Sequence, residues 1–87
     1  MTEPSTAVTV RFFAAARAAA RSDAHTLVLA PGATVSDLLA RLADGNPRLA
    51  KVLQRCSYLC DGMAVRDDSM RLHAGQTIDV LPPFAGG

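Results

Sequence analysis

The order of strand-like and helical segments along this 87-residue chain predicts one small α+β domain, with a helix laid on one face of a curved sheet. Two observations support this fold class. Apolar residues alternate with a period of two near both ends of the chain, as in strands, and recur with helical spacing between them. A chain of this length buries only roughly 60–65% of its unfolded surface, which leaves little room for an enclosed active site.

The first expected strand covers residues 7–13. It is apolar at nearly every position, so we expect it to lie centrally in the sheet. Residues 14–21 are rich in alanine and carry two arginines four residues apart, which predicts a short helical turn. A second strand is expected over residues 26–30, and Pro31-Gly32 stops it.

The clearest helix begins at Thr34, because Thr34 and Asp37 have the spacing of a capping box. One face of this helix is apolar and carries Val35, Leu38, Leu39 and Leu42. We expect Gly45 to end the helix. Asn46-Pro47 can then cap and begin another turn, whose apolar residues Leu49, Val52 and Leu53 face the core.

The opposite side of that last turn carries three cations, Arg48, Lys51 and Arg55. They form either a solvated helix face, which is the commoner case, or a docking patch that requires an acidic partner surface. The net charge of +1, from 9 Lys and Arg against 8 Asp and Glu, gives no electrostatic reason to expect nucleic acid binding.

Strand-like sequence returns after Ser57, and Asp61-Gly62 between two short apolar runs predicts a tight β-hairpin. Residues 73–75 make a further turn. The last expected strand covers residues 76–81, and Pro82-Pro83 ends it because proline donates no hydrogen bond to a sheet.

Several classes of function and site are not expected. No apolar run approaches the ~20 residues of a membrane span, and the first residues lack the features of a signal peptide, so we expect a cytoplasmic protein. Cys56 and Cys60 would lie ~13 Å apart on an extended strand, beyond the reach of a disulfide, so both are interpreted as free thiols. His25 and His73 belong to no recognisable ligand spacing, so no metal site is expected.

The chemistry is expected in the tail, residues 82–87, which could extend about 20 Å from the domain and enter the cleft of a partner. Glycine has no side chain, so Gly86 and Gly87 could pass a narrow channel and present the terminal carboxylate to a reagent. Adenylation by ATP would activate this carboxylate, and a sulfur donor could then replace AMP to leave a thiocarboxylate on Gly87. The residues expected to insert into the partner are Pro82, Pro83, Phe84, Ala85 and Gly86.

The alternatives for this tail stay open. A terminal Gly-Gly pair can be incidental, and Phe84 can pack on the domain or enter a pocket of a partner. We divide the chain into a flexible N-terminus over residues 1–6, a folded domain over residues 7–81 and a reactive tail over residues 82–87.

Two stretches, VRFFAAAR at residues 10–17 and GQTIDVLPPFAGG at residues 75–87, resemble the small subunit of molybdopterin synthase, the MoaD branch of the MoaD/ThiS sulfur-carrier family. The resemblance implies a ubiquitin-like β-grasp fold, in which a mixed sheet packs on one main helix and the first and last strands are adjacent. The sequence departs from the family pattern at Asp61, where Asn is frequent, at Gln76, where Asp is usual, and at Phe84, where a smaller aliphatic residue is common.

The resemblance also implies two partners and no active site of the chain's own. An adenylating enzyme (MoeB-like) would use ATP at the Gly87 carboxylate, and the carrier itself would hold no stably bound cofactor. A large subunit (MoaE-like), joined in a heterotetramer, would direct the sulfur to a cyclic pyranopterin precursor in molybdenum cofactor biosynthesis. The alternatives are sulfur transfer for thiamine or cysteine synthesis, a ubiquitin-like modifier that forms an isopeptide through Gly87, or a plain interaction module.

Overall fold

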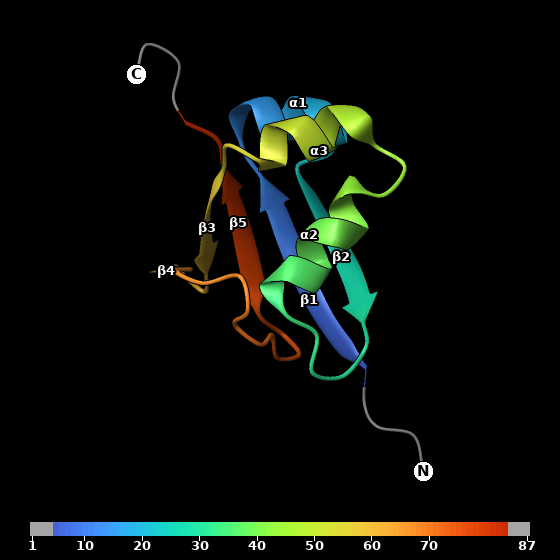
Figure 1. Ribbon diagram of the computed structural model, residues 1–87, viewed down its shortest axis with the longest axis vertical. Helices are drawn as coiled ribbons and strands as arrows, with labels where there is room; N and C mark the ends of the chain where they lie inside the picture. The colour runs from blue at the N-terminus through green and yellow to red at the C-terminus, as the bar shows by residue number, and fades with distance from the viewer. Residues whose placement is uncertain (1–4, 84–87) are drawn as a thin grey trace.

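The computed structural model describes residues 5–83 of the chain, which form a mixed sheet with helices on one of its faces (Figure 1). The strands are β1 (Thr6–Phe12), β2 (Ala24–Leu29), β3 (Ser57–Cys60), β4 (Met63–Ala64) and β5 (Thr77–Leu81). The helices are α1 (Ala14–Ala20), α2 (Val35–Ala43) and α3 (Pro47–Leu53).

The strand order in the sheet is β2-β1-β5-β3-β4. The first strand, β1, pairs antiparallel with β2 and parallel with the last strand, β5, while β3 pairs antiparallel with β5. The central place predicted for β1 is therefore confirmed, as are the α+β class, the mixed sheet and the adjacency of the first and last strands. Figure 1 shows β5 running toward the end of the sheet at which α1 and α3 lie.

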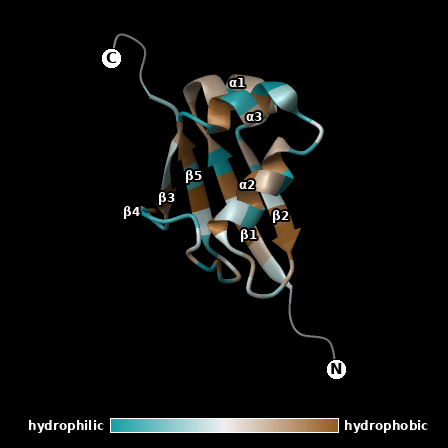
Figure 2. Cartoon of the chain, in the orientation of Figure 1, coloured by the Kyte–Doolittle hydropathy of each residue, from teal (hydrophilic) through white to brown (hydrophobic). Residues whose placement is uncertain are grey.

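One apolar core lies between the sheet and the helices. Along β1 and β5 every second side chain points into it, and Val10, Ile78 and Val80 are fully buried. Leu38 of α2 is fully buried against them, and Leu49 of α3 is 3% exposed. Figure 2 shows the apolar residues along these strands and along α2. The helices therefore cover this face of the sheet, and the opposite face is open to solvent.

The main helix, α2, begins as predicted. The hydroxyl oxygen of Thr34 accepts a hydrogen bond from the backbone N–H of Asp37 at 3.2 Å, and the Asp37 carboxylate accepts one from the Thr34 N–H at 2.9 Å. These two bonds confirm the capping box. The helix ends at Ala43, and Gly45 follows with a φ of +72°, which a residue with a side chain rarely adopts.

The next cap also agrees with the sequence. The side-chain oxygen of Asn46 accepts from the N–H of Leu49 at 3.0 Å, and its amide nitrogen donates to the carbonyl of Ala19 at 3.2 Å. The second bond was not predicted, and it ties the start of α3 to α1. These two short helices therefore sit side by side at one end of the sheet.

Five strand boundaries differ from the sequence prediction. The first strand begins at Thr6, which is buried, and Phe13 caps α1 instead of ending the strand. The second strand covers residues 24–29 and not 26–30, because Ala24 pairs with Arg11 across the antiparallel ladder. The last strand begins at Thr77, since residue 76 belongs to the preceding turn. Pairing with a neighbour, and not local propensity, sets these ends.

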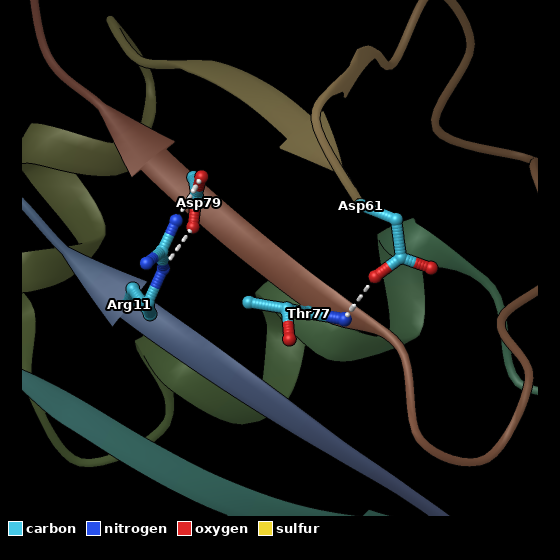
Figure 3. Close-up of polar contacts among 4 residues, drawn as sticks. All are labelled: Arg11, Asp61, Thr77 and Asp79. Carbon is cyan, nitrogen blue, oxygen red and sulfur yellow. Dashed lines mark hydrogen bonds and ion pairs between the residues drawn. The ribbon is translucent and has the colours of Figure 1, made fainter.

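The predicted hairpin is confirmed. Asp61 and Gly62 both have positive φ, 49° and 85°, as the tight turns between right-handed twisted strands require. Figure 3 shows the Asp61 carboxylate accepting a hydrogen bond from the N–H of Thr77 at 2.9 Å. The hairpin is thus tied to the start of β5.

Candidate functional site

The base of the predicted reactive tail lies at the end of β5. Leu81 ends the strand, Pro82 is buried against the domain and Pro83 is exposed. The sequence analysis placed both prolines in the tail, and the structure shows that the first of them packs on the domain. Phe84, Ala85, Gly86 and Gly87 lie outside the residues that the structure describes.

The strand that leads to the tail is held on both edges, by β1 and by β3. An ion pair adds to this. Arg11 donates two hydrogen bonds to the Asp79 carboxylate, at 2.6 and 2.8 Å, from neighbouring positions of β1 and β5 (Figure 3). The Asp79 side chain is 10% exposed, and the Arg11 guanidinium covers it from the open face of the sheet. The hydrogen bond and the attraction of Asp79 raise the pKa of Arg11 above its ordinary value.

Arg11 has a second neighbour. Its guanidinium carbon lies 5.7 Å from the centre of the Phe13 ring, within the range of a cation–π contact. Phe13 remains 39% exposed. Phe13 therefore faces solvent on the open side, whereas Phe12 belongs to the core. Sequence reasoning missed the Arg11–Asp79 pair, and the available signal was a charged residue of each sign inside two otherwise apolar strands.

The three cations of the predicted docking patch are brought together with the base of the tail. Arg48, Lys51 and Arg55 are exposed, and they line an open groove of about 480 Å³. Pro83 lines the same groove, and its apolar floor comes from Ala15 of α1 and Val52 of α3. The sequence predicted the cations but not their position beside Pro83.

The two cysteines are free thiols, as predicted. The Cys56 sulfur donates a hydrogen bond to the carbonyl of Val52 at 3.2 Å. Burial raises the pKa of both thiols, and the charge of Asp61 adds to the effect on the pKa of Cys60. Since the thiolate is the reactive form, both cysteines are weak nucleophiles near neutral pH.

Over residues 5–83, no three side chains of His, Cys, Asp or Glu gather as a metal site would require. No helix in that same range has both the length and the apolar character needed to cross a bilayer. His25 and His73 are exposed. The geometry offers a strand that is paired on both edges and is followed by Pro83, the last described residue, beside a cationic groove.

Comparison with known proteins places this geometry in a family. Residues 10–87 match the model of the ThiS family. The chain is similar to the HVO 2177 protein of Haloferax volcanii, with a TM-score of 0.85 and 27% identity over 100% of this chain and 92% of that one. It is also similar to small archaeal modifier protein 1 of Methanosarcina acetivorans, with a TM-score of 0.78 and 26% identity over 98% of this chain and 100% of that one.

A third solved structure is the complex of subunits 1 and 2 of the molybdopterin-converting factor from Helicobacter pylori. It matches with a TM-score of 0.70 and 23% identity over 94% of this chain and 100% of that one, a likeness of fold. No curated protein matches the chain. Together these similarities confirm the ubiquitin-like β-grasp fold that the sequence resemblance implied.

Proposed function

We propose, because this chain belongs to the ThiS family, that it is the sulfur-carrier small subunit of a molybdopterin synthase and carries its sulfur as a thiocarboxylate on Gly87. The chain is a small ubiquitin-like domain of the ThiS/MoaD type, a type that comprises sulfur carriers and ubiquitin-like modifiers. We propose that the tail serves sulfur transfer and not protein modification, and that the acceptor of the sulfur is a pyranopterin.

One observation carries the proposal: β5, held on both edges, ends at Leu81 and is followed by a buried Pro82 and an exposed Pro83, after which the sequence continues with Phe84, Ala85, Gly86 and Gly87. Pairing on both edges of β5 fixes the position of Pro83, from which the proposed tail would extend. Two terminal glycines then leave the carboxylate free of side chains that would block a reagent. Such an arrangement suits a substrate presented to other enzymes.

The proposed chemistry takes place on the carbonyl carbon of Gly87. A carboxylate oxygen attacks the α-phosphorus of ATP and pyrophosphate leaves, which gives an acyl adenylate. A sulfur nucleophile at the oxidation level of sulfide then attacks the carbonyl carbon. The bond from this carbon to the AMP oxygen breaks, AMP leaves with the electron pair, and a thiocarboxylate remains. ATP is a substrate of the activating enzyme, and we propose no resident cofactor for the carrier.

The proposed partners follow the same sequence of steps. A MoeB-like enzyme would adenylate Gly87, and a MoaE-like large subunit would bind the charged carrier in a heterotetramer and transfer its sulfur to a cyclic pyranopterin. The likeness to a chain of the H. pylori complex supports the second partner. Activation consumes ATP, and Cys56 and Cys60 are free, so we propose that the reaction takes place in the cytoplasm.

A second candidate function is supported by the 26% identity to small archaeal modifier protein 1. As a ubiquitin-like modifier, the adenylated Gly87 would form an isopeptide bond with a lysine amine of a target, and AMP would leave as before. The two functions share activation and differ in the nucleophile, sulfur in one case and nitrogen in the other.

A reconstituted synthase separates the candidates. Purified carrier, large subunit, adenylating enzyme, ATP, a sulfide source and the pyranopterin precursor are combined, and molybdopterin is measured by fluorescence of its oxidised derivative. The wild-type chain is expected to support its formation, and a chain lacking Gly87 is expected to fold with the same thermal stability and to support none.

Two results would reject the sulfur-carrier proposal. One is undiminished molybdopterin formation by the chain that lacks Gly87. The other is the absence of molybdopterin with wild-type carrier, accompanied by covalent adducts that survive denaturation and contain a branched Gly87–lysine peptide. The second result would establish the modifier function instead.

A further inference from the structure

The charged side chains that line the groove between α1 and α3 are all basic. Three cations line it, Arg48, Lys51 and Arg55, and no acidic side chain does. Among residues 5–83, the basic residues that form ion pairs are Arg11 and Arg17. The three cations of the groove therefore have no carboxylate partner within the described domain.

Helix stability accounts for part of this pattern. Lys51 lies in the last turn of α3 and Arg55 just beyond the helix, where cations interact favourably with the negative end of the helix dipole. Arg48 is different, because it lies in the first turn, at the positive end of the dipole, and that turn has no acidic residue to offset it. It also stands three residues from Lys51, at a spacing where like charges repel. The folding of α3 therefore gives no reason for Arg48.

The spacing of the cations indicates the shape of the ligand. Arg48 stands in the first turn of α3, Lys51 in its last turn and Arg55 just beyond its end, and all three line the groove. An extended acidic peptide can pair with all three cations at once, because alternate side chains on it are about 7 Å apart and face the same way. The apolar floor of Ala15 and Val52 would contact its aliphatic groups.

The groove is continuous with the base of the tail, because Pro83 is one of its walls. A protein that takes the tail into a cleft must place its surface next to Pro83. The rim of that cleft therefore comes within reach of Arg48, Lys51 and Arg55. Opposite charges across an interface favour docking, so a rim that fits these cations carries carboxylates.

We propose that the groove lined by Arg48, Lys51, Arg55 and Pro83 is the docking site for an extended acidic segment of the protein that receives the tail. The inference rests on the proposed function, since it names the chemistry of the partner beside the Gly87 site. The groove would steer and orient the carrier before the tail enters the cleft. Binding of the carrier would therefore depend on salt.

The test measures binding of the full chain to the adenylating enzyme of the same organism, by isothermal titration calorimetry at low and high salt. The groove variant combines Arg48→Glu, Lys51→Glu and Arg55→Glu. The control combines Arg41→Glu, Arg66→Glu and Arg71→Glu, which changes the net charge equally at exposed positions outside the groove. The groove variant is expected to bind about tenfold or more weakly and to lose most of the salt dependence, while the control stays close to wild type.

A single substitution distinguishes docking from folding. Arg48→Glu replaces a cation with an anion in the first turn of α3, which is expected to raise the thermal stability of the chain while it weakens binding. A purely structural role would move both in the same direction. Equal losses in the groove and control variants, or no loss in either, would overturn the proposal.

Other occupants would be visible in the same series. A dimer of the chain alone, detected by sedimentation and abolished in the groove variant, or a duplex DNA that binds the groove as tightly as the enzyme does, would overturn the assignment to an acidic protein segment. The chain lacking Gly87 keeps the groove, so it should still show the difference between low and high salt. If the truncated chain keeps that difference but the wild-type chain never receives sulfur on Gly87, the proposed function fails and the docking site stands.

Discussion

Arg11 and Asp79 face each other across the parallel pair β1–β5, joined by hydrogen bonds of 2.6 and 2.8 Å although 68 residues separate them in the sequence. Asp79 is nearly buried, so its carboxylate depends on this guanidinium for solvation and charge. The pair ties β1 to β5, the strand that leads toward the tail.

Removing the guanidinium is expected to destabilise the chain more than removing a surface ion pair. In Arg11→Met the long apolar stem remains, but the Asp79 carboxylate is left without its partner, and the melting temperature should fall by several degrees. Asp23→Asn is the control, because it breaks the pair with Arg17, in which both side chains are mostly exposed. Melting curves that show equal effects for the two substitutions would contradict this account.

The Asp61 carboxylate is expected to matter through its hydrogen bond and its backbone conformation. Asp61→Ala loses the acceptor for the Thr77 N–H and places alanine at a φ of 49°, for an expected loss of about 1–2 kcal/mol in urea unfolding. Asp61→Asn keeps an oxygen acceptor and tolerates positive φ, so it should lie close to wild type. An alanine variant as stable as the asparagine variant would refute the role of this side chain.

Stability should fall at alkaline pH because of Tyr58. Burial, reinforced by the nearby Cys56, raises the pKa of Tyr58 to about 12. Its hydroxyl donates to the carbonyl of Leu53 at 2.7 Å. Since the folded pKa lies above the unfolded value of about 10, this contribution is complete below pH 10 and is lost as the pH rises through about 12.

The chain contains one tyrosine, so absorbance at alkaline pH follows this phenol alone. The titration midpoint should lie well above that of the unfolded chain in urea. In Tyr58→Phe the unfolding free energy should fall by about 0.5–1.5 kcal/mol near neutral pH. Above pH 10 the unfolding free energy of this variant should decrease less than that of the wild type. Coincident midpoints for the folded and unfolded chains would show that the hydroxyl is not held in the folded state.

Arg21 offers a stabilising substitution. It ends α1 with a φ of 58°, where glycine carries no steric penalty, so Arg21→Gly is expected to raise the unfolding free energy by about 0.5–1 kcal/mol. Ala18→Gly, at an exposed position within the same helix, should instead lower it by a similar amount. The same sign for both substitutions, measured by urea unfolding, would rule out the backbone explanation.

Features that depend on neighbours in the sequence could be predicted. The Thr34 cap and the Asp61-Gly62 hairpin each arise within a few residues, so side-chain type and spacing were enough to find them. The Arg11–Asp79 pair could not be found in this way, because it exists only once β1 and β5 are placed in parallel register. Tertiary pairing also moved the ends of β2, whose added residues have weak strand propensity.

Part of the candidate site could also be predicted from the sequence, and part of it could not. The cations of α3 were identified from helical spacing, since residues three and four apart share a face. The groove they form with Ala15 and Pro83 depends on the packing of α1 against α3 and on the direction in which β5 ends, which no local pattern encodes. The burial of Pro82 depends on tertiary packing in the same way.

The central claim, that sulfur is carried on Gly87, is tested most directly by the intact mass of the chain after incubation with ATP, a matched adenylating enzyme and a sulfur source. The account predicts that one terminal oxygen is exchanged for sulfur in the wild-type chain and that a chain lacking Gly87 keeps its mass. An unchanged wild-type mass, with an enzyme shown to be active on its own carrier, would contradict it.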